Sequence, residues 1–161
     1  MFSRAWDWIC NRIRRLLFPI LLRWSTHVHT DVRRLTRNTV IKLGGPSSLS
    51  TEARAMQFVS RHTSIAVPKF FDFWRGVDNQ GYLVTEFIQD GDRLDREWWS
   101  LTEEQKETVR VILRGYIDQL RAIKQPEPSG WIGSIDGKGA HDYRADSTRF
   151  GPFRTMTGFH D

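Results

Sequence analysis

The chain has 161 residues, enough for one ordinary domain with a core, and its formal charge is +5. The positive charge is confined to residues 1–37, where eight Arg stand against two Asp (8 − 2 = +6), so the remainder sums to −1. A nucleic-acid binder carries its basic side chains on the folded body, so we expect no nucleic-acid partner. The lone Cys10 excludes an intramolecular disulfide and fits a reducing, cytoplasmic compartment.

Residues 1–25 have the pattern of a basic amphipathic helix. The apolar stripe consists of Trp6, Ile9, Ile13, Leu17, Ile20 and Trp24, and Arg12, Arg15 and Arg23 lie off it. The apolar run 16–22 contains Pro19 and is far shorter than the roughly 20 residues that a membrane span needs. No convincing secretory cleavage site follows it. Peripheral membrane contact through residues 1–24, organelle targeting and packing of the stripe on the adjoining lobe stay open, and we favour packing.

Residues 26–88 are predicted to form an antiparallel sheet with one helix. Residues 28–32 and 39–43 are β-prone, and the polar segment 33–38 between them suits a hairpin or a wide turn. After a glycine-rich break, Ser50 is a good N-cap for a helix over about 51–62. A second hairpin pairs residues 69–74 with 81–88, which leads to a hinge at 89–92.

Lys42 and Glu52 are the candidate site residues of this region. Lys42 interrupts an apolar strand, where its ammonium either reaches water or meets a buried partner, and an edge-strand lysine is the plain alternative. Glu52 falls in the first turn of the predicted helix, on the face that packs inward with Met56. A lysine oriented by a helix glutamate is the arrangement that kinase sites use to bind nucleotide phosphates.

Residues 89–161 change to helical and loop character. Thr102 and Gln105 predict a capping box, and the helix that follows has the apolar period of a scaffold helix packing beneath the hinge. Its apolar positions are Val109, Ile112, Leu113, Tyr116, Ile117, Leu120 and Ile123. Beyond it, glycines and prolines predict a long loop anchored by Trp131, Ile132 and Ile135.

Three metal or phosphate patterns are weak. A calcium loop begun at Asp90 needs Gly and Glu where the chain has Asp95 and Leu101. Gly44-Gly45 lacks the Gly-Lys-Ser/Thr ending of a P-loop. A histidine metal site begun at His27 and His29 has no third ligand at a fixed spacing, so we expect no metal site.

The ordered motifs resemble the amino-terminal lobe of the aminoglycoside phosphotransferase family, within the protein-kinase-like superfamily, and its fungal members in particular. The resemblance covers roughly residues 28–161. It rests on the segments 40–42, 52–56, 62–69 and 81–88, and on 131–137 with 151–153. It implies an α+β fold with a kinase-like N-terminal lobe at 26–88 and a hinge with the first helical part of a second lobe at 89–161. The basic helix at 1–25, which its own pattern predicts, precedes them.

The resemblance implies ATP with Mg²⁺ as cofactor and a hydroxyl of an unknown small molecule as phosphate acceptor. Lys42 would bind the phosphates, Glu52 would orient Lys42, and the backbones of Glu86 and Ile88 would hold adenine. The catalytic His-Gly-Asp segment and the metal-binding Asp are expected beyond residue 161, so no catalytic or metal residue is assigned and this chain alone is expected to be inactive. Whether it is an enzyme stays open, because a non-catalytic nucleotide-binding, interaction or membrane-docking module is the alternative.

Overall fold

The computed structural model describes residues 15, 17, 18, 20, 22–89, 91–125, 130–141 and 149–160. The chain divides into two compact units. Unit 1 comprises Met1–Met56 with Val67–Asp92, and unit 2 comprises Gln57–Ala66 with Arg93–Asp161. The predicted hinge region at 89–92 thus ends at the boundary where unit 1 gives way to unit 2.

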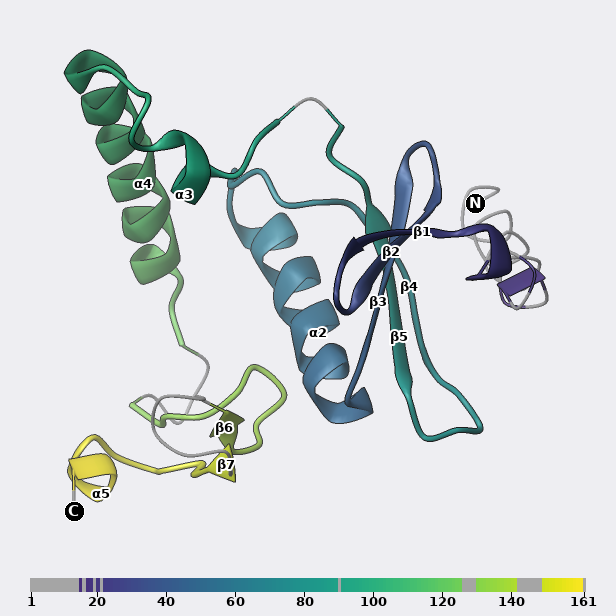
Figure 1. The fold of residues 1–161 in the computed structure, drawn as a ribbon. Coiled ribbons are helices and arrows are strands. Elements are labelled where there is room, and N and C mark those ends of the chain that lie inside the picture. The colour runs from purple at the N-terminus through teal and green to yellow at the C-terminus, as the bar shows by residue number, and fades with distance from the viewer. Residues whose placement is uncertain are drawn as a thin grey trace, which may run out of the picture. The chain divides into compact units, whose positions relative to one another are not determined.

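Unit 1 is built on a five-stranded antiparallel sheet, which confirms the α+β class. Its strands are β1 (Thr26–His29), β2 (Val32–Thr36), β3 (Thr39–Gly44), β4 (Phe70–Arg75) and β5 (Gly81–Glu86). They lie in the order β1-β2-β3-β5-β4, with every neighbouring pair antiparallel. Figure 1 shows this sheet with α2 (Pro46–His62) on one side of it.

Of the two alternatives predicted for 33–38, the hairpin is confirmed and the wide turn is wrong, because most of the segment is strand β2, which pairs antiparallel with β3. Only Arg37 and Asn38 form the turn to β3. The arginines made the segment look like a loop, but a partly exposed strand accommodates their long side chains. The Arg34 guanidinium lies 4.4 Å from the ring centre of Phe87 and donates a hydrogen bond to the Thr36 carbonyl.

Helix α2 begins at Pro46, five residues before the predicted start. Proline suits the first helical position because its missing N–H has no partner there in any case. Ser50 therefore lies inside the helix, and Glu52 is not in the first turn, so the predicted support from the helix dipole is wrong. The early start is permitted by Gly81, where a Cβ would stand 2.8 Å from the Pro46 Cα.

The two faces of the sheet carry separate apolar clusters. On the inner face, Leu83 packs against Leu49 and Ala53 of α2. On the outer face, Ile41 and Val84 are fully buried with Tyr82. This alternation follows the two-residue period of strands, so each face needs its own cover.

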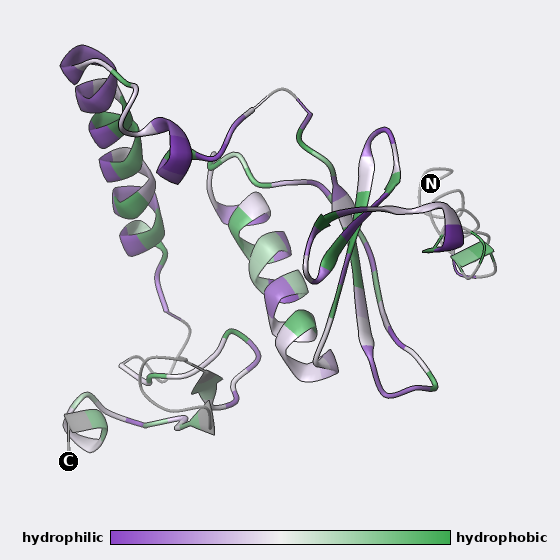
Figure 2. Ribbon diagram, in the orientation of Figure 1, coloured by the Kyte–Doolittle hydropathy of each residue, from purple (hydrophilic) through white to green (hydrophobic). Residues whose placement is uncertain are grey.

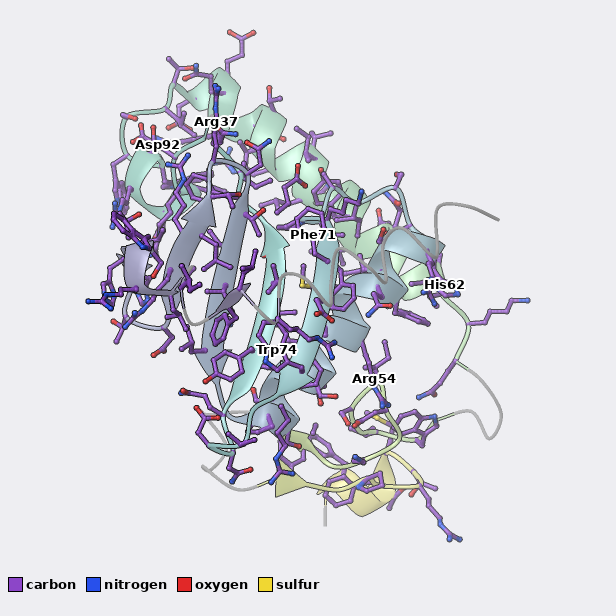
Figure 3. The ribbon with its side chains drawn as sticks, turned by 90° about the vertical axis from the view of Figure 1, so that its right-hand side faces the viewer. Arg37, Arg54, His62, Phe71, Trp74 and Asp92 are labelled. Carbon is purple, nitrogen blue, oxygen red and sulfur yellow. The ribbon has the colours of Figure 1, made fainter. Side chains whose placement is uncertain are left out.

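A bulge in β4 places an acid on the outer face. The register shifts between Phe70 and Asp72, and Asp72 then pairs with Val84. Asp72 is the buried charged residue of this face. Figure 3, which faces this side of the sheet, labels Phe71 and Trp74 on it.

Helical residues near the N-terminus cover the outer face. Arg15 donates hydrogen bonds of 2.8 and 2.7 Å to the two carboxylate oxygens of Asp72, and its guanidinium lies 5.5 Å from the Trp74 ring centre. The Asp72 carboxylate raises the pKa of Arg15 through these hydrogen bonds. The Phe18 ring meets Trp74 and Tyr82 edge-on, at centroid distances of 5.2 and 4.7 Å.

The face that makes this contact is not the predicted one. Leu17, Ile20 and Trp24 belong to the predicted stripe, yet their exposed fractions are 45, 59 and 82%. Arg15, which lies off the stripe, instead binds the sheet. Trp6, Ile9, Ile13 and Arg12 lie outside the described residues.

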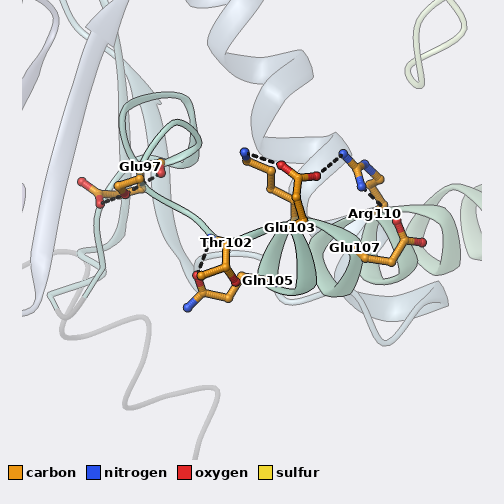
Figure 4. Close-up of polar contacts among 8 residues, drawn as sticks. Glu97, Thr102, Glu103, Gln105, Glu107 and Arg110 are labelled. Carbon is orange, nitrogen blue, oxygen red and sulfur yellow. Dashed lines mark hydrogen bonds and ion pairs between the residues drawn. The ribbon is translucent and has the colours of Figure 1, made fainter.

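The part of unit 2 that follows residue 92 contains one long helix, α4 (Glu103–Ala122). Its short elements are α3 (Leu94–Glu97), β6 (Ala140–His141), β7 (Arg149–Phe150) and α5 (Thr157–His160). The predicted capping box of α4 is confirmed, since the Thr102 hydroxyl accepts from the Gln105 amide and the Gln105 side chain accepts from the Thr102 amide (Figure 4). None of the helices in the described ranges is long and apolar enough to cross a membrane.

The predicted packing of α4 is not found. Although its sequence is amphipathic, no residue of the helix is buried. Figure 2 shows hydrophobic residues in green among hydrophilic ones along α4. The Gln119 side chain accepts hydrogen bonds from the backbone N–H and the hydroxyl of Ser64, which joins α4 to the segment that follows α2.

The loop after α4 has two of its three predicted anchors. Trp131 and Ile132 are half-buried, and Ile132 forms an antiparallel bridge with Phe153. Ile135 is exposed, so its predicted anchoring role is wrong. It lies in the turn between Ser134 and Gly137, and turns of this kind run over the protein surface.

We predict that Arg15→Met destabilises the fold by about 1 to 3 kcal/mol, because it leaves the buried Asp72 carboxylate without its bidentate donor. The matched control is Arg23→Met, an exposed arginine of the same helical segment, with an expected change within about 0.5 kcal/mol. Urea unfolding followed by circular dichroism measures both. Equal midpoints for the two variants would contradict a stabilising role of the Arg15–Asp72 ion pair.

We predict that alkaline pH removes stability through Tyr82. Burial, with the hydrogen bond that its hydroxyl donates to Asp78 at 2.6 Å, raises the pKa of Tyr82 from 10.0 to about 12. The folded state therefore favours the neutral phenol, and this contribution is complete below pH 10.0 and lost as the pH rises to about 12. Unfolding midpoints measured across that range should fall less in Tyr82→Phe than in the control Tyr116→Phe.

Candidate functional site

The predicted meeting of Lys42 with Glu52 is confirmed. Ile41 points to the outer face of the sheet, so the next residue, Lys42, lies on the inner face, where it pairs in register with Leu83. On α2, Glu52 lies three residues after Leu49 and four before Met56, and both of these pack on the same face. The helix register thus brings the carboxylate to the strand lysine.

The contact between the two side chains is bidentate. The Lys42 Nζ lies 3.0 Å from Glu52 Oε1 and 2.8 Å from Oε2. An ammonium has three N–H donors and no acceptor, so a contact with one carboxylate leaves hydrogen-bonding capacity for another anion. The arrangement orients a positive charge without using all of its hydrogen-bonding capacity.

The pair is half-exposed, with side-chain exposures of 41% for Lys42 and 37% for Glu52. Ion pairs this accessible to water contribute about 0 to 1 kcal/mol to stability. The sheet already has its apolar cover from Leu49 and Ala53 without them. Substitution of Lys42 therefore tests binding with little disturbance of the fold.

The two residues predicted to hold adenine lie at the end of β5 (Glu86) and two residues beyond it (Ile88). Glu86 pairs in register with Thr39, three residues along β3 from Lys42, which corresponds to about 10 Å of strand. The Glu86 amide donates to the Lys69 carbonyl, and its carboxylate accepts from the Lys69 amide. Ile88 is exposed, and within the described residues no hydrogen bond involves its amide.

A set of polar contacts that the sequence did not suggest fastens the hinge to the β2–β3 turn. The Phe87 amide donates to the Asn38 carbonyl at 3.0 Å. The Gln89 side-chain nitrogen Nε2 donates to Asn38 Oδ1, and Arg37 Nε donates to Gln89 Oε1 at 3.2 Å. The partners are about 50 residues apart, so no local pattern could have revealed them.

The histidines and acids considered as metal ligands do not gather into a site within the described residues. His27 and His29 are both exposed on β1. Across the described ranges, no three His, Cys, Asp or Glu side chains gather into a group that could hold a metal ion. Asp95 is instead paired with Arg93 at 2.6 Å, and Asp90 lies outside the described residues. The hydrogen bonds from Arg93 lower the pKa of Asp95.

Comparisons with protein-family models, with curated proteins and with solved structures find no match to this chain. The candidate site is therefore defined by its own geometry. It consists of the Lys42–Glu52 pair and, on the same pair of strands, the end of β5 with Glu86 and Ile88.

Proposed function

We propose that unit 1 is a nucleotide-binding lobe of the protein-kinase-like type. The observation that carries the proposal is the Lys42 ammonium held by both oxygens of Glu52 on the inner face of the sheet. In this proposal Lys42 binds the phosphates of ATP and Glu52 keeps the ammonium oriented. A charged donor held in place before binding gives affinity that a freely moving surface lysine does not.

The end of β5 is proposed to bind the base. Adenine would accept from the Ile88 amide and donate to the Glu86 carbonyl, both backbone groups. The hydrogen bond from the Phe87 amide to the Asn38 carbonyl supports this role, because it holds the backbone next to Ile88, and the Gln89 side chain contacts the same Asn38. The separation of about 10 Å between Lys42 and Glu86 along the strands leaves room for a ribose between base and phosphates.

The residues fit the nucleotide better than they fit its metal ion. Lys42 supplies a cation for phosphate, but the described residues supply no group of carboxylates for Mg²⁺. For residues 1–161 we accordingly propose nucleotide binding and no transfer of phosphate. In a larger phosphotransferase, the acceptor would be a hydroxyl of a small molecule, and its chemistry is not specified by these residues.

We predict that the purified chain binds a fluorescent ATP analogue saturably in the presence of Mg²⁺. Lys42→Ala should weaken binding by about tenfold to a hundredfold, because a hydrogen bond between charged groups contributes about 1.5 to 3 kcal/mol. Glu52→Gln should have a smaller effect, since the lysine remains but loses its carboxylate. Titration by fluorescence anisotropy measures all three affinities.

The matched control for this prediction is Lys69→Ala. Lys69 belongs to the same unit, but its Nζ lies 5.6 Å from the ring of Phe71, an outer-face residue. Its affinity should equal that of the unchanged chain. If all the chains bind equally, the fluorophore binds elsewhere, and if none binds, the nucleotide proposal is wrong.

The alternative function is a non-catalytic interaction module, and the surface of α4 favours it. Five large apolar residues of this helix are exposed: Val111, Ile112, Leu113, Ile117 and Leu120. We propose a second copy of the chain as the occupant. The first half of α4 sums to −1, from three Glu against Lys106 and Arg110, and the second half sums to +1, from Arg114 and Arg121 against Asp118. An antiparallel pair of these helices would therefore set opposite charges side by side.

We predict concentration-dependent dimers that charge reversal abolishes. Glu103→Lys/Glu107→Lys and Arg114→Glu/Arg121→Glu should each give monomers, because each makes the charges of the two halves alike. An equimolar mixture should dimerise again, since each variant then meets the opposite charge. Sedimentation velocity measures the states, and circular dichroism checks that the helix survives loss of the Glu103 and Glu107 ion pairs (Figure 4). A chain that stays monomeric at high concentration would exclude this role.

A further inference from the structure

The helical residues near the N-terminus have two opposite faces. Arg15 and Phe18, three residues apart, contact the sheet. Leu17, Ile20 and Trp24 follow each other at spacings of three and four, which puts them on one face of a helix. At 100° per residue their face is turned roughly half a revolution from Arg15 and Phe18. The contact with the sheet therefore orients the second face away from it.

This second face is an apolar ridge, which we define as Leu17, Ile20 and Trp24. Each of the three has an exposed large apolar side chain, and Trp24 is the most exposed of them. Exposed apolar side chains gathered on one helix face, instead of scattered singly, mark a binding surface. Tryptophan also favours the boundary between water and lipid, because its ring is apolar and its N–H is polar.

The charge of the N-terminal part of the sequence favours an anionic partner. Residues 1–37 carry eight Arg and two Asp, for a net +6, while the rest of the chain sums to −1. Arg23 is exposed in the same helical segment as the ridge. Arginines are attracted to an anionic lipid surface, so the charge and the apolar ridge act together.

We propose that the ridge docks the protein on the surface of anionic bilayers, while Arg15 and Phe18 keep the opposite side of the segment on the sheet. The partner is a lipid surface, since apolar side chains next to arginines match the acyl and headgroup layers of a membrane. The segment lies on the bilayer and does not cross it. This proposal stands apart from nucleotide binding, because the ridge and Lys42 belong to different faces of unit 1.

The test is co-sedimentation of the full chain with vesicles of phosphatidylcholine, with and without phosphatidylserine. The unchanged chain should bind the mixed vesicles, and binding should fall as salt is added. Ile20→Glu/Trp24→Glu should bind at least about tenfold more weakly, because it removes apolar contact and adds negative charge to the ridge. Val77→Glu/Trp99→Glu is the matched control, with two exposed apolar residues changed elsewhere, and should bind like the unchanged chain.

Other outcomes would overturn the proposal. Equal binding by the ridge variant would mean that the arginines alone adsorb the chain, and equal loss in the control variant would mean a non-specific effect of charge. Association of the unchanged chain without lipid, abolished by the ridge variant, would assign the ridge to a second copy. An unchanged urea midpoint of Ile20→Glu/Trp24→Glu shows that this variant keeps the Arg15–Asp72 ion pair. A loss of lipid binding is then not a loss of fold.

Discussion

The packing of Leu83 against Leu49 and Ala53 is the contact on which the candidate site depends. It fixes the rotation of α2 against the sheet, and with it the side of the helix that Glu52 occupies. A rotation of α2 by one residue, about 100°, would move the carboxylate away from Lys42. The polar pair is weak because it is half-exposed, so it follows from the apolar contact and does not cause it.

The outer face differs, because there a buried charge, Asp72, lies on the edge strand β4. The bulge in β4 turns Asp72 to the same face as Ile41 and Val84, where an unpaired carboxylate would be costly. Arg15 satisfies it with two hydrogen bonds, and Phe18 covers the ring of Tyr82 beside it. The N-terminal segment is thus part of the fold on one side, which leaves its other side for a different partner.

The sequence predicts elements whose signals are local, but it does not reveal features that depend on residues far along the chain. The signals for the capping box at Thr102 and for the hairpin of β4 and β5 each lie within a short stretch of sequence, so both were found. The start of α2 depends on Gly81, more than 30 residues away, which lets Pro46 approach β5. Periodicity revealed the stripe of Leu17 and its neighbours, but the side that meets the sheet is chosen by Asp72, 57 residues after Arg15.

Both proposed functions of unit 1 use side chains that contribute little to folding. Lys42 keeps hydrogen-bonding capacity beyond its contact with Glu52, and the exposed fractions of Leu17, Ile20 and Trp24 are 45, 59 and 82%. The groups that bear on stability, Leu83 and Asp72 among them, are buried and cannot meet a ligand. Because binding and stability rest on different residues, each binding role can be removed by substitution while the sheet persists. The same separation lets nucleotide binding and lipid binding be tested one at a time on a single folded chain.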